Sequence, residues 1–290
     1  MGELLFGLGI PAAAAPGADP VGAARAAEEL GFDFVGTTDH LHGSSPSFET
    51  WTLLTWIAAA TSRIGVATRV LATPMRPPPV VAKMAESLDR LSGGRLILGV
   101  GGGSMDEEFA AFGLGAWSPR DKVDGMEEAI RIMRGMWSQE SFTFSGRLYR
   151  TAGARIEPKP RRRIPVWLGT YGNRALAVTG RLADGWIPSL GFAAPEQIPA
   201  MRDRVLAAAR DAGRDPAEIT CAYNLTVRVD DRAKPRPDTV TGPADAVAEQ
   251  LLGFLGLGFT ALNFISTGPD PAGQAERLAR EVLPAVRGAA

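Results

Sequence analysis

Short apolar runs alternate with longer amphipathic stretches along almost the whole chain. The runs have the length and the Val, Ile and Leu content of strands that are buried on both faces. The stretches between them repeat apolar residues at helical spacing, and the first begins with a capping signal, Asp19 followed by Pro20. The pattern predicts strands over residues 4–10, 32–38, 63–71, 95–101, 166–169, 185–188, 219–229 and 261–265.

Helices are predicted between and after these strands. Their ranges are 19–31, 50–62, 78–91, 106–113, 119–137, 174–182, 195–212, 243–256 and 271–287. Eight strands that each lead into a helix indicate a parallel sheet, and this number favours closure into a (β/α)8 TIM barrel. An open doubly wound sheet is the alternative, but no GxGxxG turn follows the first strand. We therefore expect one α/β barrel domain over residues 1–290.

Two segments depart from this alternation. Between residues 139 and 160, Phe142-Thr143-Phe144 and Leu148-Tyr149 flank a Ser-Gly turn, which predicts a hairpin insertion outside the barrel. Residues 230–242, which include two prolines, are predicted to form a mobile loop over one mouth of the barrel.

Composition and charge exclude several classes of function. The chain is 45% hydrophobic and 22% charged, which is typical of a soluble globular protein. A formal net charge of −1 gives no electrostatic basis for binding nucleic acid or an anionic membrane. Cys221 is the only cysteine, so no intramolecular disulfide forms, and its apolar surroundings predict an inert buried thiol. Neither a signal-peptide pattern nor an apolar run of transmembrane length is present, which predicts a cytoplasmic protein.

The C-terminal ends of barrel strands are where such folds place their active sites. Asp39 and His40 stand at the end of the second predicted strand, and His40 is one of only two histidines in the chain. A histidine beside an aspartate at this position predicts a general acid or base, although the pair could instead cap the following loop. Both histidines share one loop and no HExxH motif or cysteine pair occurs, so no metal site is predicted. A serine hydrolase is disfavoured because the chain has no GxSxG elbow.

Two glycine-rich segments follow other strands. Gly101, Gly102 and Gly103 end the fourth predicted strand, where they would allow a ligand to approach the backbone or simply form a flexible loop. Residues 169–172 lead into a helix, whose free N–H groups and positive dipole end suit a phosphate. In that second segment Thr170 could add a hydroxyl donor.

Four stretches of sequence together resemble the luciferase-like monooxygenase superfamily, specifically its coenzyme F420-dependent oxidoreductase branch. They read ARAAEELGFDFVGTTDH, PMRPPPVVAKMAESLDRLSGGRLILGVGGG, PVWLGTYGNRALAVTGRLADGW and GPADAVAEQLLGFLGLGF. The resemblance covers most of the chain and implies a barrel with a deazaflavin lying across its C-terminal mouth.

The resemblance also implies roles for individual residues. Asp39 and His40 match a pair beside the cofactor ring, with His40 as the proton-transfer residue. Three residues match a bulge that backs the deazaflavin and that often contains a non-prolyl cis peptide; they are Thr68, Arg69 and Val70, with the cis bond between the last two. Seven residues match glycine loops along the cofactor tail and its phosphate: Gly101, Gly102, Gly103, Gly169, Thr170, Tyr171 and Gly172.

The expected activity is hydride transfer between F420 and a small organic substrate. F420-dependent sugar-phosphate dehydrogenases carry a tryptophan and a glutamate where this chain has Ser44 and Ser104, so oxidation of a sugar phosphate is disfavoured. Basic side chains near the mouth favour the acidic tail of F420 over FMN, unless these side chains lie at the surface. They are Arg69, Arg76 and Arg174.

Two alternatives to this activity remain open. An FMN-dependent two-component monooxygenase of the same fold would use flavin reduced by a separate enzyme. A barrel without catalytic activity is the other. The resemblance further implies a homodimer, and a separate flavin or F420 reductase is the expected source of reduced cofactor.

Overall fold

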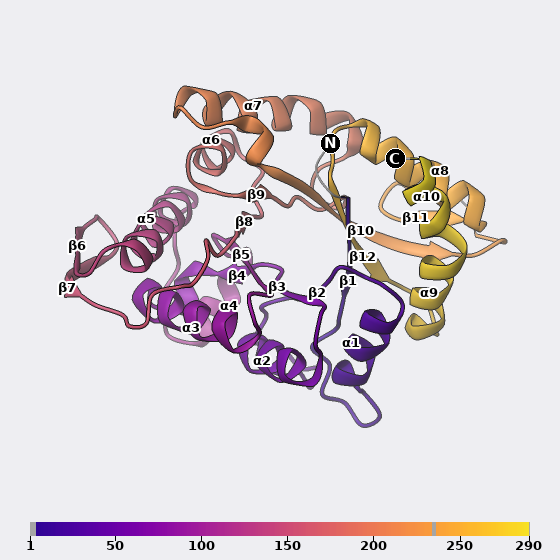
Figure 1. Cartoon of the computed structure of the whole chain (residues 1–290), viewed down its shortest axis with the longest axis horizontal. Helices are drawn as coiled ribbons and strands as arrows, with labels where there is room; N and C mark the ends of the chain where they lie inside the picture. The colour runs from indigo at the N-terminus through magenta and orange to yellow at the C-terminus, as the bar shows by residue number, and fades with distance from the viewer. Residues whose placement is uncertain (1–3, 234–235, 290) are drawn as a thin grey trace.

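Eight parallel strands close into a barrel in the computed structural model, which describes residues 4–233 and 236–289 (Figure 1). Each strand pairs with the next, and β10 pairs with both β9 and β12, which completes the circle. The barrel strands, in spatial order, are β1 Leu5–Gly9, β2 Phe34–Thr37, β3 Gly65–Thr68, β5 Leu96–Gly101, β8 Val166–Leu168, β9 Gly185–Trp186, β10 Thr220–Val229 and β12 Ala261–Ser266. The predicted (β/α)8 barrel is confirmed.

Helices surround the barrel on its outside (Figure 1). They are α1 Pro20–Glu29, α2 Thr50–Ala60, α3 Pro78–Leu91, α4 Asp106–Ala111, α5 Pro119–Ser138, α6 Asn173–Leu182, α7 Ile198–Asp211, α8 Ala244–Gly256, α9 Pro271–Arg277 and α10 Leu283–Ala289, with short 3-10 turns at Thr73–Met75, Pro195–Gln197 and Pro216–Glu218. The single helix predicted over residues 271–287 is instead α9 and α10 joined by a π-helical turn, Leu278–Val282. None of the helices described combines the length and apolar content needed to cross a bilayer.

Apolar side chains fill the barrel from inside as well as outside. Phe34, Ala67 and Trp167 belong to an inner cluster, whereas most other buried residues lie between the barrel and its helices. The Phe34 ring occupies the space above Gly7, where an added Cβ would come within 2.2 Å of it. This packed plug closes the lower part of the barrel and leaves the polar groups of the upper mouth for chemistry.

The third predicted strand, residues 63–71, is not continuous. It is β3 followed by β4, Leu71–Ala72, which pairs with β5 beyond a cis peptide bond between Arg69 and Val70. The Thr68 hydroxyl donates to the carbonyl oxygen of Gly99 at 2.6 Å. The interruption and the cis bond therefore lie where the resemblance predicted them.

The predicted hairpin insertion is confirmed, but Leu148 and Tyr149 lie in its turn and the second strand begins only at Arg150. Strands β6, Phe142–Ser145, and β7, Arg150–Ala154, form an antiparallel pair beside α5, on the outside of the barrel (Figure 1). The segment predicted as an open loop, residues 230–242, ends instead in a short strand, β11 Val240–Gly242, that pairs with β10. Residues 234–235 of that segment lie outside the described part of the chain.

Candidate active site

The loop after β2 presents Asp39 to a set of donors rather than to open solvent. Its buried carboxylate accepts the backbone N–H of Ala72 at 2.9 Å and both terminal nitrogens of Arg76, at 2.9 and 3.0 Å. A bidentate guanidinium pair fixes a carboxylate in position and orientation. Asp39 therefore anchors the loop that carries His40.

Arg76 continues this network to the start of α2. Its guanidinium also contacts Glu49, which caps that helix by accepting the N–H of Thr52 at 2.7 Å. Burial acts to lower the pKa of Arg76, but the two carboxylates outweigh burial and raise it. The charge of Arg76 is therefore fully used within the protein.

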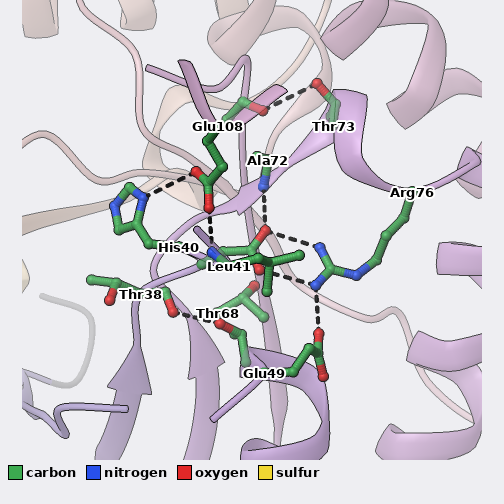
Figure 2. Close-up of polar contacts among 12 residues, drawn as sticks. Thr38, His40, Leu41, Glu49, Thr68, Ala72, Thr73, Arg76 and Glu108 are labelled. Atoms are coloured by element: carbon green, nitrogen blue, oxygen red, sulfur yellow. Dashed lines mark hydrogen bonds and ion pairs between the residues drawn. The ribbon is translucent and has the colours of Figure 1, made fainter. Parts of the chain in front are cut away.

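Glu108 of α4 holds the next residues of the same loop (Figure 2). This buried carboxylate accepts the backbone N–H groups of Leu41 and His42, the latter at 2.9 Å, and lies 3.4 Å from Nδ1 of His40. Because an ionised carboxylate only accepts hydrogen bonds, it selects the form of His40 with the proton on Nδ1. The half-exposed His40 ring then keeps Nε2 available to take or give a proton at the mouth.

Three strands bring Val70, Gly101 and Gly169 together. A Cβ at Gly101 would lie 2.7 Å from a methyl of Val70, and a Cβ at Gly169 would lie 3.4 Å from the same side chain. The cis-linked Val70 thus fills the space left by glycines of β5 and of the segment after β8. Three of the residues predicted to bind the cofactor form one wall of the mouth.

Gly102 and Gly103 are needed for packing of the protein itself. Gly103 has a φ of 82°, and a Cβ there would come within 2.2 Å of the Phe109 ring on α4. At Gly102 an added Cβ would lie 3.0 Å from Lys122 of α5. These glycines therefore let α4 and α5 pack over the end of β5. The glycine pattern in the sequence alone does not reveal this reason for having glycine at the two positions. Their role along a cofactor stays a prediction.

The loop before α6 differs in part from the predicted phosphate cradle. The hydroxyl of Thr179 donates to the carbonyl of Ala175, so the buried Thr170 hydroxyl must donate to Thr179, 2.7 Å away. The Thr170 hydroxyl is thus engaged inside the protein, and its role toward a phosphate stays a prediction. Gly172 is the N-cap of α6 with no side-chain cap, which leaves the helix N-terminus open to a ligand.

Tyr171 of the same loop turns toward β9. Its hydroxyl oxygen accepts the backbone N–H of Ser189 at 3.1 Å, and burial raises the pKa of the phenol. Arg174 pairs with Asp124 of α5, and its side chain is half-exposed. The surface position and the ion pair of Arg174 remove it as support for an acidic cofactor tail.

Arg69 differs from the other two arginines at the mouth. Its side chain lies inside the barrel, passes Gly36 of β2 and ends beside Gly9 of β1. Burial lowers its pKa to about 10, so the guanidinium is protonated at neutral pH. Among the described residues, it has no ion-pair partner.

Sequence reasoning missed the side chains that hold the loop in place. Glu108 stands in an acidic run that indicates only the start of a helix. Glu49 precedes α2 and likewise indicates no more than a helix start. The hairpin insertion was not connected to the site either, yet the Tyr149 hydroxyl donates to the carbonyl of Thr73 at 3.1 Å. Thr73 in turn donates to Gly101 at 3.1 Å, so the insertion is linked to the mouth.

The described barrel and its mouth agree with the comparison to known protein families. Residues 6–238 match the family model described as luciferase-like monooxygenase. The chain belongs to the luciferase-like monooxygenase family. The resemblance carried by the loop at Asp39 and by the glycine run ending at Gly103 is thereby confirmed at the level of the family.

Two curated relatives are similar over most of this chain. The F420-dependent glucose-6-phosphate dehydrogenase of Nakamurella multipartita is 33% identical over 228 residues, which are 74% of this chain and 65% of that protein. The 5,10-methylenetetrahydromethanopterin reductase of Methanolobus tindarius is 29% identical over 254 residues, 87% of this chain and 72% of that protein.

A solved structure shares the fold of the whole chain. It is an F420-dependent secondary alcohol dehydrogenase in complex with an F420–acetone adduct, and it superposes with a TM-score of 0.88 at 21% identity. The match covers 98% of this chain and 99% of that one. The likeness shows that the two chains share one fold.

Proposed function

We propose that this protein is an oxidoreductase that transfers a hydride between coenzyme F420 and a small organic substrate at the barrel mouth. The observation that carries the proposal is the pairing of His40 with Glu108 at the edge of the wall formed by Val70, Gly101 and Gly169. The curated F420-dependent dehydrogenase of Nakamurella multipartita supports the choice of cofactor.

The residues of the mouth fit a deazaflavin. The smooth wall of Val70, Gly101 and Gly169 suits the face of a flat ring, and the uncapped N-terminus of α6 after Gly172 suits the phosphate of its tail. When bound, F420 supplies the carbon that gives or accepts the hydride. The protein must then hold substrate and ring in contact and manage one proton.

His40 is the residue that we assign to this proton. Reduction of a carbonyl by hydride leaves an oxygen that needs a proton, and oxidation of an alcohol releases one. Nε2 of His40 can serve both directions while Glu108 keeps the proton on Nδ1. Asp39, held by Arg76, is a positioning residue for this loop.

Substrate and assembly complete the proposal. Ser44 and Ser104 replace the tryptophan and glutamate of sugar-phosphate dehydrogenases, so we propose a substrate other than a sugar phosphate. We also propose a cytoplasmic homodimer that receives reduced cofactor from a separate reductase.

Cofactor titration tests the proposal. The purified protein is titrated with F420 and, separately, with FMN while quenching of its tryptophan fluorescence is followed. Binding of F420 at micromolar concentration, with FMN bound at least about tenfold more weakly, is the expected result. Preference for FMN would indicate the monooxygenase alternative, and failure to bind either would indicate a barrel without catalytic activity.

A further inference from the structure

Arg69 occupies a channel that two glycines leave open. Its stem passes Gly36, where an added Cβ would lie 3.6 Å from Cδ, and its guanidinium reaches Gly9, where an added Cβ would lie 3.3 Å from a terminal nitrogen. A Cβ added at Gly9 would also lie 3.4 Å from the side chain of Ile265 on β12. The guanidinium therefore lies inside the barrel mouth at the seam of β1 and β12.

No negative charge of the described residues compensates this guanidinium. The ion pairs of the described chain use Arg76 and Arg174 but not Arg69, and the buried Nε of Arg69 has no hydrogen-bond partner. Burial inside the barrel lowers its pKa, in agreement with the lack of an ion-pair partner among the described residues. A partly buried guanidinium in a barrel mouth that has no charged partner among the described residues is available to bind an anion from outside the chain.

A tail phosphate bound at the N-terminus of α6, as proposed above, is not that anion. The tail loop follows β8, whereas the guanidinium lies at β1, and these strands are separated by β2, β3 and β5 on one side and by β12, β10 and β9 on the other. Strands separated equally in both directions face each other across the barrel. An anion at Arg69 therefore lies across the mouth from the N-terminus of α6.

The neighbouring wall of the barrel interior is polar. Asn263 donates to Asn224 at 2.9 Å and Asn224 donates to Ser189 at 3.1 Å, which links β12, β10 and the segment after β9. Asn263 pairs with Gly7 in the sheet, so it shares the inner face with Gly9. The Oδ1 atom of Asn263 is buried without a partner. Polar groups and one cation thus line the same side of the mouth.

We propose that Arg69 binds the carboxylate of a small organic acid, which is the substrate of this barrel. A guanidinium matches a carboxylate through two parallel hydrogen bonds, and one positive charge suits a monoanion better than a phosphate dianion. The assignment of this anion as substrate rests on the proposed hydride transfer, because only then does a reacting carbon have to lie between His40 and Arg69.

Matched probes test this inference. Binding of crotonate and of its neutral amide, crotonamide, is measured by calorimetry for the wild type, Arg69→Leu and Arg69→Lys, with and without F420. We expect the wild type to prefer crotonate at least about tenfold, Arg69→Leu to lose this preference and Arg69→Lys to keep part of it. Arg174→Leu, which removes a mouth arginine already paired with Asp124, is expected to keep the full preference.

The remaining outcomes separate the two proposals. Equal binding of crotonate and crotonamide by the wild type, or a preference that survives in Arg69→Leu, would overturn the role of Arg69. A loss of F420 affinity of more than about tenfold in Arg69→Leu, without any change in carboxylate preference, would assign Arg69 to the cofactor instead. If the wild type binds no F420, the hydride proposal fails, and the measurements without cofactor still decide whether Arg69 binds a carboxylate.

Discussion

Two arginines at one barrel mouth have opposite electrostatic surroundings. Arg76 contacts the carboxylates of Asp39 and Glu49, whereas Arg69 has only neutral neighbours among the described residues. The first stabilises the loop that carries His40, and the second carries an uncompensated charge inside the barrel. At the residue scale, the site thus combines a firmly held loop that carries His40 with one cation that has no ion-pair partner among the described residues.

Exchanging each arginine for methionine is expected to change stability in opposite directions. Arg69→Met removes a desolvated charge and should raise the free energy of unfolding by roughly 1–3 kcal/mol, given about 1.4 kcal/mol per pKa unit. Because burial lowers the pKa of Arg69 only to about 10, the charge and its cost are present throughout the neutral range and fade above that pH. Arg76→Met leaves Asp39 without its counter-charge and should lower the free energy of unfolding by about 3–5 kcal/mol. Urea unfolding of the cofactor-free protein checks both, and a destabilised Arg69→Met would contradict the assignment of an unpaired cation.

His40 and Glu108 should affect turnover but not cofactor affinity. His40→Ala removes the proton-transfer group and is expected to lower kcat about 10²–10⁴-fold. Glu108→Gln keeps an acceptor for the loop but no longer fixes the proton on Nδ1, so we expect a smaller loss, about tenfold, in kcat with KM unchanged. Steady-state kinetics with a substrate found by screening organic acids, alcohols and carbonyl compounds gives kcat and KM, and F420 titration provides the control. Unchanged turnover in His40→Ala would refute the proton role.

The interrupted strand made of β3 and β4 shows what the sequence can and cannot predict. Eight strands, their helices and the hairpin are visible because each follows from a local run of apolar or turn residues. The break after Thr68 depends on its bond to Gly99, and the anchors of the His40 loop, Arg76 and Glu108, lie 37 and 68 residues away from their partners. Contacts between distant segments have no local signature, so the hydrophobic pattern predicts a continuous strand, only the family resemblance places a bulge there, and neither identifies the anchors.

Helix α3 fastens the chain that returns from the hairpin insertion. Glu86, buried on α3, contacts Arg90 at 2.6 Å and Lys83 at 3.0 Å. Arg90 and Lys83 in turn donate to the carbonyls of Lys159 and Glu157, at 2.7 and 2.8 Å. One buried carboxylate therefore orients two cations that hold the segment between β7 and β8.

Replacing Glu86 is expected to make the free energy of unfolding depend less on pH in the acidic range. Burial acts to raise the pKa of Glu86, but the bonds from Arg90 and Lys83 prevail and lower it below 4.5. A lowered pKa adds stability above the unfolded value, and this contribution is lost as the pH falls through the folded pKa. Glu86→Gln should therefore cost roughly 1–3 kcal/mol near neutral pH, because both cations are partly exposed, and the difference from the wild type should shrink below pH 4.5. Thermal unfolding across this range checks it, and a constant difference would contradict the role of the charge.

At the scale of the whole molecule, one outer face stands out by its apolar surface. Trp56 of α2 is 69% exposed, and Val80 and Leu91 of α3 are 50% and 81% exposed. These helices are neighbours on the outside of the barrel (Figure 1). A groove between them has a mainly apolar lining that includes Met84 and Leu88. A cluster of large apolar side chains on a water-facing surface is typical of a protein interface. Glu49, the N-cap of α2, belongs to the network around Asp39, so α2 connects this face to the His40 loop.

The proposed homodimer should form through this face of α2 and α3. Size-exclusion chromatography with light scattering is expected to give twice the chain mass of 30.6 kDa for the wild type and a single chain mass for Trp56→Glu combined with Leu91→Glu. A charge in the centre of an apolar interface has no counter-charge and prevents association, whereas it is harmless at a surface that stays exposed. Phe192→Glu provides the matched control, because Phe192 is 75% exposed but lies between β9 and α7, away from this face, and this variant should remain a dimer. Circular dichroism excludes misfolding of the double variant, and a double variant that keeps twice the chain mass would place the interface elsewhere.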